Sequence, residues 1–589
     1  MSLTLKTIQR GNYMGRYDGL PIRVKISLLI IWPIHAVVRR LAAALTNFQI
    51  FLSNTEVRLL NKEFSLLKAQ SDLGLSAAGV VPVLTTSHCQ FIAERLAQML
   101  RSVGIRSDVI TTKPAKGFSP YPHIVICPQM FQELPKTYYA FQMEQSVNPR
   151  WFTRSYFKIL KTAQAMFDYS MTNLAYLEDR GFDWKKVFYL PVTADPSSKV
   201  LAVNPSPEEE YDVVFYGDDK NPRRRRFLDA LEKSFRVKVI NNQFGEALYA
   251  ELSKAKVIVN IHYYENALLE TTRLAEALSL GALIVSEDSK DRSDYPQLDE
   301  LVDFVPVDDV GAMVERVAFW LRDGEARRIR KQANHRLLTS MPDLMEFYFF
   351  RFLLAQNLIG FETFYERCAR HINVGSFMCL GLPEVQSRMR EFLKLERREI
   401  QYFSGIRHQK GWIGCALSYK FLLLKARDQG LDQIAICEDD VEFPSDWDLQ
   451  LQKVNKYLVE KAGGWHVFSG LMAVVSPETR VKKIAEFSGL TFAHIDRMMS
   501  TVFNVYSKRV FDVFARWDET DIDPNRNTID KYMERQPDLD IVTTRPFLVG
   551  HKHEAASTLW GIGNKQYDPM IAKSSMELSR KIDNFIAKK

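Results

Sequence analysis

Cysteine is scarce in this chain, with six among 589 residues. None of the six forms a CxxC pair, and most of them lie within apolar runs. This pattern predicts reduced core cysteines in a cytosolic protein, and it argues against a secreted or lumenal protein held together by disulfides. The six are Cys89, Cys127, Cys368, Cys379, Cys415 and Cys437.

Long apolar runs are also lacking in the amino-terminal segment. Its most apolar stretch, residues 26–34, contains Pro33 and is shorter than the roughly 20 residues of a spanning helix. It also lacks a small-residue cleavage site of the signal-peptide kind. Basic residues flank the stretch, which suits a helix in the membrane interface facing anionic lipids. The alternative is a buried helix packed on the next domain. Residues 56–75 have helical spacing and could extend this segment or form a homo-oligomer contact.

A strong net charge is absent as well. The formal net charge is +7, and basic residues are spread along the chain, so a nucleic-acid partner is not expected. We find no short repeat and no low-complexity tract. The hydrophobic fraction of 46% allows several packed cores. At about 150 residues per domain, the length predicts roughly three or four domains.

The most informative feature is a short apolar run, residues 434–437, that ends in Glu438, Asp439 and Asp440. Carboxylates at the end of a buried strand face the crevice where open α/β sheets bind ligands. Clustered hard oxygen ligands suit Mg²⁺ or Mn²⁺, and such an ion suits a diphosphate. The alternative is a solvated acidic turn without a metal.

Several segments around this run share their order and spacing with a known family. Residues 405–408, 411–419 and 500–509 surround the acids, and residues 378–383 with Arg388 and Arg390 precede them. In this order they resemble family 25 glycosyltransferases, the lipopolysaccharide and collagen galactosyltransferase type, with their "GEIGCALSH", "LEDD" and "AYVIS" motifs. The resemblance covers roughly residues 372–560. The chain departs from the family pattern at two positions, Trp412 in place of Glu and Tyr419 in place of His.

The resemblance implies a GT-A type α/β domain that transfers a sugar, commonly galactose, from a UDP-sugar. It implies that a divalent ion bridges Glu438 or Asp440 to the donor diphosphate, and that Arg407 and Glu438 contact the donor. Asp530 matches the family's late aspartate and is the expected catalytic base. Asp521 and Asp523 are the competing candidates, and all three could instead be loop or cap residues.

Two histidines follow a late apolar run, His551 and His553. A late histidine often completes the metal shell in GT-A enzymes, and imidazole suits Mn²⁺ better than Mg²⁺. We therefore expect Glu438, Asp440, His551 and His553 to be the metal ligands. The alternative is that these histidines are inert loop residues.

The first half of the chain alternates short β-branched runs with amphipathic segments between residues 80 and 319. This alternation is typical of parallel α/β units. Strands are expected at residues 211–216, 237–241, 257–262 and 282–286, and a helix is expected at residues 266–278.

The segment around that helix resembles the nucleotide-sugar half of a GT-B glycosyltransferase. Such a helix presents its N-terminus to the donor diphosphate and holds it without a metal cofactor. The resemblance places Arg273 on the donor and Glu276 on its ribose. The first acid of the common E-x7-E pair would fall at position 268, which is Leu268. Retaining chemistry of that type is therefore unsupported, and the stereochemical outcome is open.

An arginine run, residues 223–226, follows the first of these strands. Consecutive helical residues point to different sides, so at most two of the four can face one ligand. One reading places Arg223 or Arg224 on the donor diphosphate. The other is a solvated basic helix start.

The partner domain of a GT-B pair would lie upstream, within residues 76–200. His88 and Glu144 each follow a strand-like run, where acceptor-side catalytic groups lie in this architecture. Both could instead be core polar residues. A linker is expected at residues 204–210, which are rich in proline and glutamate.

The expected fold class is α/β, with a GT-B type double Rossmann-like module followed by one GT-A-like domain. The expected segments are a membrane-associating segment at 1–75, the two GT-B domains at 76–200 and 201–355, the family 25-like domain at 356–575 and a basic tail at 576–589.

These observations favour a bifunctional glycosyltransferase that uses UDP-sugars and a lipid-linked saccharide acceptor. Its expected place is cytoplasmic, peripheral on the inner face of the bacterial inner membrane, in lipopolysaccharide O-antigen or capsule synthesis. The main alternative is one active family 25-like transferase with a glycan-binding or scaffold GT-B module. Two others are a nucleic-acid-binding protein that uses the arginine run and an enzyme whose acid triplet is structural and metal-free.

Overall fold

A computed structural model describes residues 79–195, 197, 209–397, 399–559 and 563–588. The segment expected at 1–75 and most of the linker expected at 204–210 lie outside the described residues. Ala78–Lys589 form one unit. No helix among the described residues is both long enough and apolar enough to cross a membrane.

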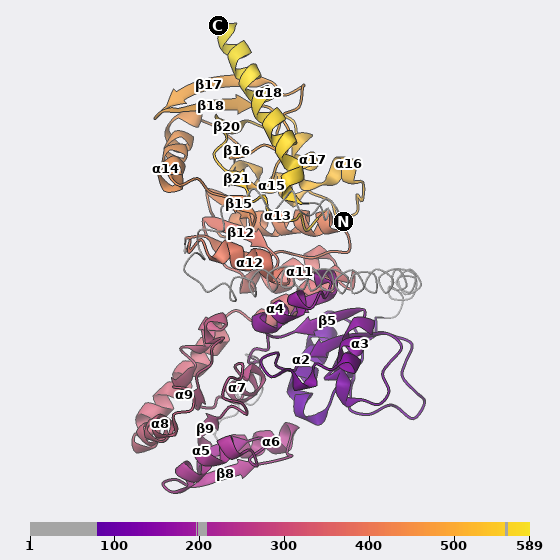
Figure 1. The fold of residues 1–589 in the computed structure, drawn as a ribbon, viewed down its shortest axis with the longest axis vertical. Coiled ribbons are helices and arrows are strands. Elements are labelled where there is room, and N and C mark those ends of the chain that lie inside the picture. The colour runs from indigo at the N-terminus through magenta and orange to yellow at the C-terminus, as the bar shows by residue number, and fades with distance from the viewer. Residues whose placement is uncertain (1–78, 196, 198–208, 398, 560–562, 589) are drawn as a thin grey trace, which may run out of the picture. The chain divides into compact units, whose positions relative to one another are not determined.

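The first sheet is six-stranded and parallel, in the order β2-β1-β3-β4-β5-β6 (Figure 1). Its strands β3, β4 and β5 are buried along their whole length, which explains why most of their residues are apolar. The elements are β1 (Val83–Leu84), α2 (Gln90–Ser102), β2 (Val109–Ile110), β3 (His123–Ile126), β4 (Tyr138–Gln142), α3 (Arg154–Thr162), β5 (Ala165–Asp168), α4 (Met171–Asp179) and β6 (Val187–Tyr189).

The second sheet is five-stranded and parallel, in the order β11-β10-β9-β7-β8. Together the two sheets confirm the parallel α/β units predicted for the first half. The elements are β7 (Tyr211–Tyr216), α5 (Pro222–Glu232), β8 (Val237–Ile240), α6 (Gly245–Leu252), β9 (Ala255–Asn260), α7 (Thr271–Leu278), β10 (Ile284–Glu287), β11 (Val302–Val305), α8 (Val310–Arg322) and α9 (Gly324–Ser340).

The helix expected at residues 266–278 begins only at Thr271. The backbone N–H of Leu268 donates to the side chain of Gln145, at 3.0 Å. That of Leu269 donates to Asp291, at 2.9 Å. These side chains of distant residues take the place of helical partners, so the preceding loop is fixed by tertiary contacts.

Helix α10 (Leu344–Ala355) is buried at every position and joins the first sheet to the last domain. Its Phe352 ring lies 4.5 Å from the ring of Phe167 in β5. On the other side, the guanidinium of Arg351 forms a fully buried ion pair with Glu384, at 2.6 Å. The same side chain donates to the carbonyl of Gly405 at 2.6 Å.

The last domain is built on an eight-stranded mixed sheet, in the order β13-β12-β14-β19-β16-β20-β18-β17. β15, which follows β14 in the chain, and β21, which follows β20, form a separate two-stranded antiparallel sheet. The strands are β12 (Phe377–Gly381), β13 (Gln401–Ser404), β14 (Gln433–Glu438), β15 (Val441–Glu442), β16 (Val467–Ser469), β17 (Val481–Phe487), β18 (Leu490–Ile495), β19 (Phe503–Ser507), β20 (Ile541–Arg545) and β21 (Gly550–His551).

The helices of this domain include one that passes an expected boundary. Helix α18, yellow in Figure 1, runs without a break from Asp568 to Ala587, so the boundary expected at residue 575 falls inside it. The others are α11 (Phe361–Cys368), α12 (Gln386–Leu393), α13 (Gly411–Asp428), α14 (Trp447–Tyr457), α15 (Phe511–Ala515), α16 (Pro524–Asn527) and α17 (Ile529–Glu534).

Candidate active sites

A cavity of about 670 Å³ is lined by residues of both parallel sheets. It lies where β7 and β8 end and where α7 begins, which is the edge at which parallel α/β sheets bind ligands. The first sheet's region contributes His88, Met143, Gln145 and Tyr169, and the second contributes Tyr216–Lys220, Ile240–Phe244, Leu248, Glu270–Arg273 and Glu276.

Glu270, directly before α7, is the cavity residue that the sequence analysis missed. Its carboxylate lies 3.0 Å from Arg224, 3.5 Å from the ring of His262 and 3.7 Å from Arg273. Burial raises the pKa of Glu270, but the charges of Arg273 and Arg224 outweigh it and hold this pKa well below its usual range. The sequence does hold a signal for this residue: Glu270 stands two residues after Leu268, the position where the first acid of the E-x7-E pair would fall.

Arg273 and Glu276 both lie on α7 and line the cavity, as the resemblance implied for donor contacts. Gly217 permits the approach of Arg273, because a Cβ at that position would lie 2.6 Å from the guanidinium Nη2. Gly217 also has a φ of +127°, which a residue with a side chain rarely adopts. Burial raises the pKa of Glu276 to about 7, so this carboxyl titrates near neutral pH.

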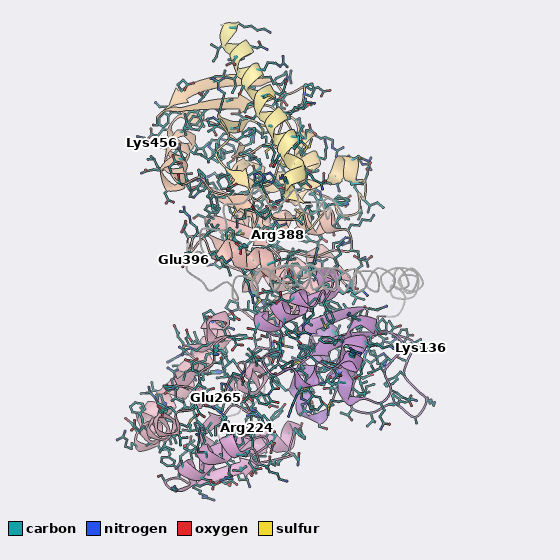
Figure 2. The ribbon with its side chains drawn as sticks, in the orientation of Figure 1. Lys136, Arg224, Glu265, Arg388, Glu396 and Lys456 are labelled. Carbon is teal, nitrogen blue, oxygen red and sulfur yellow. The ribbon has the colours of Figure 1, made fainter. Side chains whose placement is uncertain are left out.

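Arg223 and Arg224, on α5, point to partners in the protein rather than into the cavity. Arg223 donates to Glu287 at 2.8 Å and to the carbonyl of His262 at 2.7 Å. Arg224, labelled in Figure 2, donates to the carbonyl of Ile261 at 2.9 Å and pairs with Glu270. Neither side chain lines the cavity. Arg224 therefore acts on the cavity through two residues of its wall, Glu270 and the carbonyl of Asp218, to which it donates at 3.2 Å.

The two acceptor-side candidates, His88 and Glu144, line two adjoining cavities. His88 is exposed and lines the large cavity. Glu144 lines a smaller cavity of about 200 Å³ that shares Gln145 and Glu270 with the large one. Glu144 accepts a hydrogen bond from Gln129 at 2.7 Å, and burial raises its pKa. His88 thus shares a cavity with residues of α7, and Glu144 shares the smaller one with Glu270, directly before α7.

The acid triplet lies at the carboxyl end of β14, as the sequence predicts. Arg388 of α12, labelled in Figure 2, donates to Asp439 at 2.8 Å and lies 3.0 Å from Asp440. Burial raises the pKa of Glu438 to about 7 and that of Asp439 to about 6. Three adjacent carboxylates therefore share Arg388, and burial disfavours their full ionisation.

Asp440 has the chemistry that a hard divalent ion requires. Its Oδ2 accepts a hydrogen bond from Asn564 at 2.8 Å, whereas its Oδ1 is buried without a hydrogen-bond partner within the described structure. An unpartnered buried carboxylate oxygen is costly unless a cation or donor meets it. Asp440, with Glu438 next to it along the strand end, therefore fits a Mg²⁺ or Mn²⁺ ion.

His551 and His553 pair with Asp568 and not with an acid of the triplet. Pairing of β21 with β15 places His551 opposite Val441, one residue after Asp440. The rings of His551 and His553 each lie 3.0 Å from a carboxylate oxygen of Asp568. Among the described residues, one group of three or more histidine, cysteine or acid side chains has its ligand atoms close enough together to hold a metal ion. It consists of His88, Cys89 and Cys127. The four predicted ligands do not form such a group.

Asp530 lies in the first turn of α17, where it accepts a hydrogen bond from the Thr528 hydroxyl at 2.7 Å. Burial, and then the charges of Glu438 and Asp530, raise the pKa of the Cys415 thiol. Both carboxylates therefore act electrostatically on the same thiol of α13.

Arg407, predicted on the donor, is buried against the first sheet's region. Its guanidinium lies 3.8 Å from the ring centroid of Phe188. It donates to the carbonyls of Lys185 at 2.6 Å and Trp184 at 3.1 Å. In this structure Arg407 connects the last domain to the first sheet.

Comparison with known proteins finds a family model that matches part of the chain. Residues 223–341 match the family model described as glycosyl transferase-like. This segment contains Glu270, Arg273 and Glu276, three residues of the cavity wall. The match confirms the prediction of a glycosyltransferase enzyme. No curated protein matches the chain in sequence.

Solved structures similar to this chain include three with coverage of nearly their whole length. They are WaaG, a glycosyltransferase involved in lipopolysaccharide biosynthesis (10% identity, 47% of this chain, 98% of that chain, TM-score 0.34), sucrose-phosphate synthase from Thermosynechococcus elongatus (13%, 47%, 98%, 0.32) and a glycosyltransferase from Rickettsia africae (9%, 49%, 98%, 0.31).

Proposed function

We propose that this enzyme transfers sugars from nucleotide-sugar donors at two centres. The first is a GT-B type centre in the 670 Å³ cavity, and the second is a GT-A type centre at the carboxyl end of β14. The observation that carries the proposal is the convergence of Glu270, Arg273 and Glu276 on one cavity, within the segment that matches the glycosyltransferase-like family.

At the first centre, the protein alone supplies the positive charge for the donor diphosphate. The guanidinium of Arg273 and the N-terminus of α7 both face the cavity, and each attracts phosphate oxygens. Glu276, in its carboxylate form, accepts hydrogen bonds from the ribose hydroxyls. Glu270 holds Arg273 in position through their ion pair at 3.7 Å.

At the second centre, Asp440 and Glu438 would hold Mn²⁺ or Mg²⁺. When bound, the ion supplies positive charge for the diphosphate of the leaving nucleotide. Asp530 takes the proton of the attacking acceptor hydroxyl, which is the role of a general base. Its neighbour Thr528 fixes the carboxylate by a hydrogen bond of 2.7 Å.

Two centres on one chain suit the assembly of a repeating disaccharide, because one centre receives the other's product at high local concentration. We propose a UDP-sugar, galactose among the candidates, as donor and a lipid-linked saccharide as acceptor. Residues 1–75 would bind the inner face of a bacterial inner membrane, which suits lipopolysaccharide O-antigen or capsule synthesis. The basic flanks of residues 26–34 support this placement.

The position of Arg388 favours a second candidate for the last domain, transfer without a metal. Its guanidinium lies 3.0 Å from Asp440 and 2.8 Å from Asp439, so it supplies one positive charge at the acid triplet. A chelator separates the two candidates, because transfer by a metal-free centre survives it.

The test is transfer by the full chain, with a panel of UDP-sugars and a synthetic lipid-linked acceptor. We expect Glu276→Gln to remove one sugar addition and Asp440→Asn to remove the other. Matched controls are the exposed acids Glu246, at the start of α6, and Asp432, just before β14, each changed to its amide. If Glu276→Gln still permits both additions, the first half is a scaffold and the two-centre proposal is wrong.

A further inference from the structure

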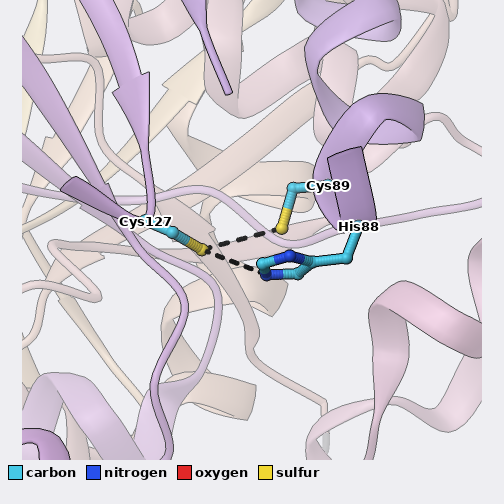
Figure 3. Close-up of side chains that lie close together, drawn as sticks. All are labelled: His88, Cys89 and Cys127. Carbon is cyan, nitrogen blue, oxygen red and sulfur yellow. Dashed lines mark hydrogen bonds between the residues drawn. The ribbon is translucent and has the colours of Figure 1, made fainter. Parts of the chain in front are cut away.

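Three side chains that no step above uses converge beside the large cavity. Figure 3 shows His88, Cys89 and Cys127 facing one another. The sulfur of Cys127 lies 3.6 Å from the sulfur of Cys89 and 3.8 Å from Nε2 of His88. One ligand atom from each residue lies within 4.8 Å of the other two. Soft thiolates with an imidazole are the ligand set that zinc prefers.

The fold brings these residues together from adjacent strands. β1 and β3 pair in parallel, and both groups follow the carboxyl ends of these strands. A short helical turn, Ser87–Cys89, presents His88 and Cys89. Cys127 follows β3 directly and has φ +53° and ψ +56°. This left-handed conformation is uncommon for a residue with a side chain, and such strain concentrates at functional sites.

We propose that His88, Cys89 and Cys127 bind a zinc ion. Tetrahedral zinc with bonds of about 2.3 Å to sulfur and 2.0 Å to nitrogen separates two sulfurs by about 3.8 Å, and a sulfur and a nitrogen by about 3.5 Å. The observed separations of 3.6 and 3.8 Å match this spacing. A disulfide needs sulfurs about 2.05 Å apart, which the observed pair does not meet.

The site would keep one coordination position open toward the cavity. Cys89 and Cys127 are buried, whereas His88 is exposed and belongs to the cavity wall. Three protein ligands and one open position are typical of zinc sites that bind a water or a ligand oxygen. The zinc would therefore present its fourth position to whatever oxygen-bearing molecule occupies the cavity.

The experiment titrates the metal-free full chain with Zn²⁺ and, separately, with Co²⁺ as a spectroscopic probe. We expect about one zinc per chain and a thiolate-to-cobalt charge-transfer band, which carboxylate ligands do not produce. His88→Ala and Cys127→Ala should each weaken zinc binding by roughly tenfold or more, and Cys127→Ala, which removes a thiolate, should also reduce the band. His88 is exposed, so its variant should fold even if the buried Cys127 variant does not.

Two variants control for other thiols and other metal sites. Cys379 and Cys437 are buried and contact each other in register across β12 and β14, so Cys379→Ala should leave zinc binding and the band unchanged. Asp440→Asn should also leave the band unchanged. Absence of a thiolate band in the wild-type chain would overturn the proposal. So would unchanged zinc affinity in His88→Ala, an undiminished band in Cys127→Ala, or a Cys89–Cys127 disulfide found by mass spectrometry of the purified chain.

Discussion

The large cavity and the end of β14 balance their buried acids in different ways. Both lie at the carboxyl ends of strands in parallel pairs. In the cavity, Glu270 faces Arg224, Arg273 and His262. At the end of β14, three consecutive carboxylates share Arg388.

The pKa values of Glu270 and of the triplet acids follow this difference, whereas Glu276, elsewhere in the cavity wall, has a pKa raised by burial. The pKa of Glu270 lies well below its usual range because cations surround the carboxylate and outweigh its burial. Burial raises the pKa of Glu438 to about 7 and that of Asp439 to about 6, and Arg388 does not offset it. Under the proposed function, Arg273 and the N-terminus of α7 supply the positive charge for the donor diphosphate in the cavity, whereas the acid triplet has negative charge left for a divalent ion.

Removal of Arg388 should have the largest effect. Breaking a buried ion pair costs roughly 3–5 kcal/mol, so Arg388→Met should lower the free energy of unfolding by about that amount in chelator. Added Mn²⁺ should restore part of it, because the ion takes over the neutralisation of the acids. Denaturant unfolding with and without Mn²⁺ measures this effect.

Arg351→Met is the matched control for that variant. Arg351 pairs with Glu384, and not with a triplet acid, in a fully buried ion pair at 2.6 Å. Its loss should be similarly destabilising, with no recovery in Mn²⁺. Equal recovery of both variants would show that the ion stabilises the chain somewhere other than the acid triplet.

Asp440→Asn should lower metal-dependent sugar transfer by about a hundredfold or more, since metal charge stabilisation contributes several kcal/mol. The readout is the initial rate of the chelator-sensitive addition. Asp432→Asn, which changes an exposed acid just before the same strand, should transfer at the wild-type rate. An unchanged rate for Asp440→Asn would place the metal, or the chemistry, elsewhere.

Glu276→Gln should weaken UDP binding by about tenfold, because a hydrogen bond to a charged group contributes about 1.5 kcal/mol. Isothermal titration calorimetry on the full chain measures it, with Asp440→Asn as background so that only the first centre is titrated. Glu246→Gln should bind UDP as the wild type does. The same affinity in Glu276→Gln would exclude Glu276 from the donor site.

The smallest effect is on pH dependence. Burial raises the pKa of Glu276 to about 7, so the carboxylate that accepts ribose hydroxyls is scarce at pH 6 and dominant at pH 8. UDP affinity should therefore rise by up to about tenfold over this range. Glu276→Gln should show only the change due to UDP itself. Parallel curves for the two proteins would contradict the assignment.

Residue pattern alone predicted the elements that local sequence determines. Continuous apolar runs located the parallel strands, and the abrupt change to acid after residue 437 located the carboxyl end of β14. Arg273 and Glu276 were predicted from the resemblance of their segment to the nucleotide-sugar half of GT-B glycosyltransferases, and both line the cavity. Each of these signals lies within a few neighbouring residues.

Ion-pair partners could not be predicted, because the fold selects them over long separations. Arg223 pairs with Glu287, 64 positions away, and Arg388 with Asp439, 51 positions away. Cys127 meets Cys89 across 38 positions. Arg223 thus looked available for a phosphate in the sequence, while Arg388 and the cysteines gave no sign of their partners.

The most direct test of the central claim is chelation applied to the two single-site variants. Asp440→Asn leaves only the cavity to act, and Glu276→Gln leaves only the acid triplet. We expect the chelator to spare transfer by Asp440→Asn and to abolish transfer by Glu276→Gln, with recovery in Mn²⁺. Chelator-resistant transfer by Glu276→Gln would contradict the proposed metal-dependent centre, because the acid triplet would then act without a divalent ion.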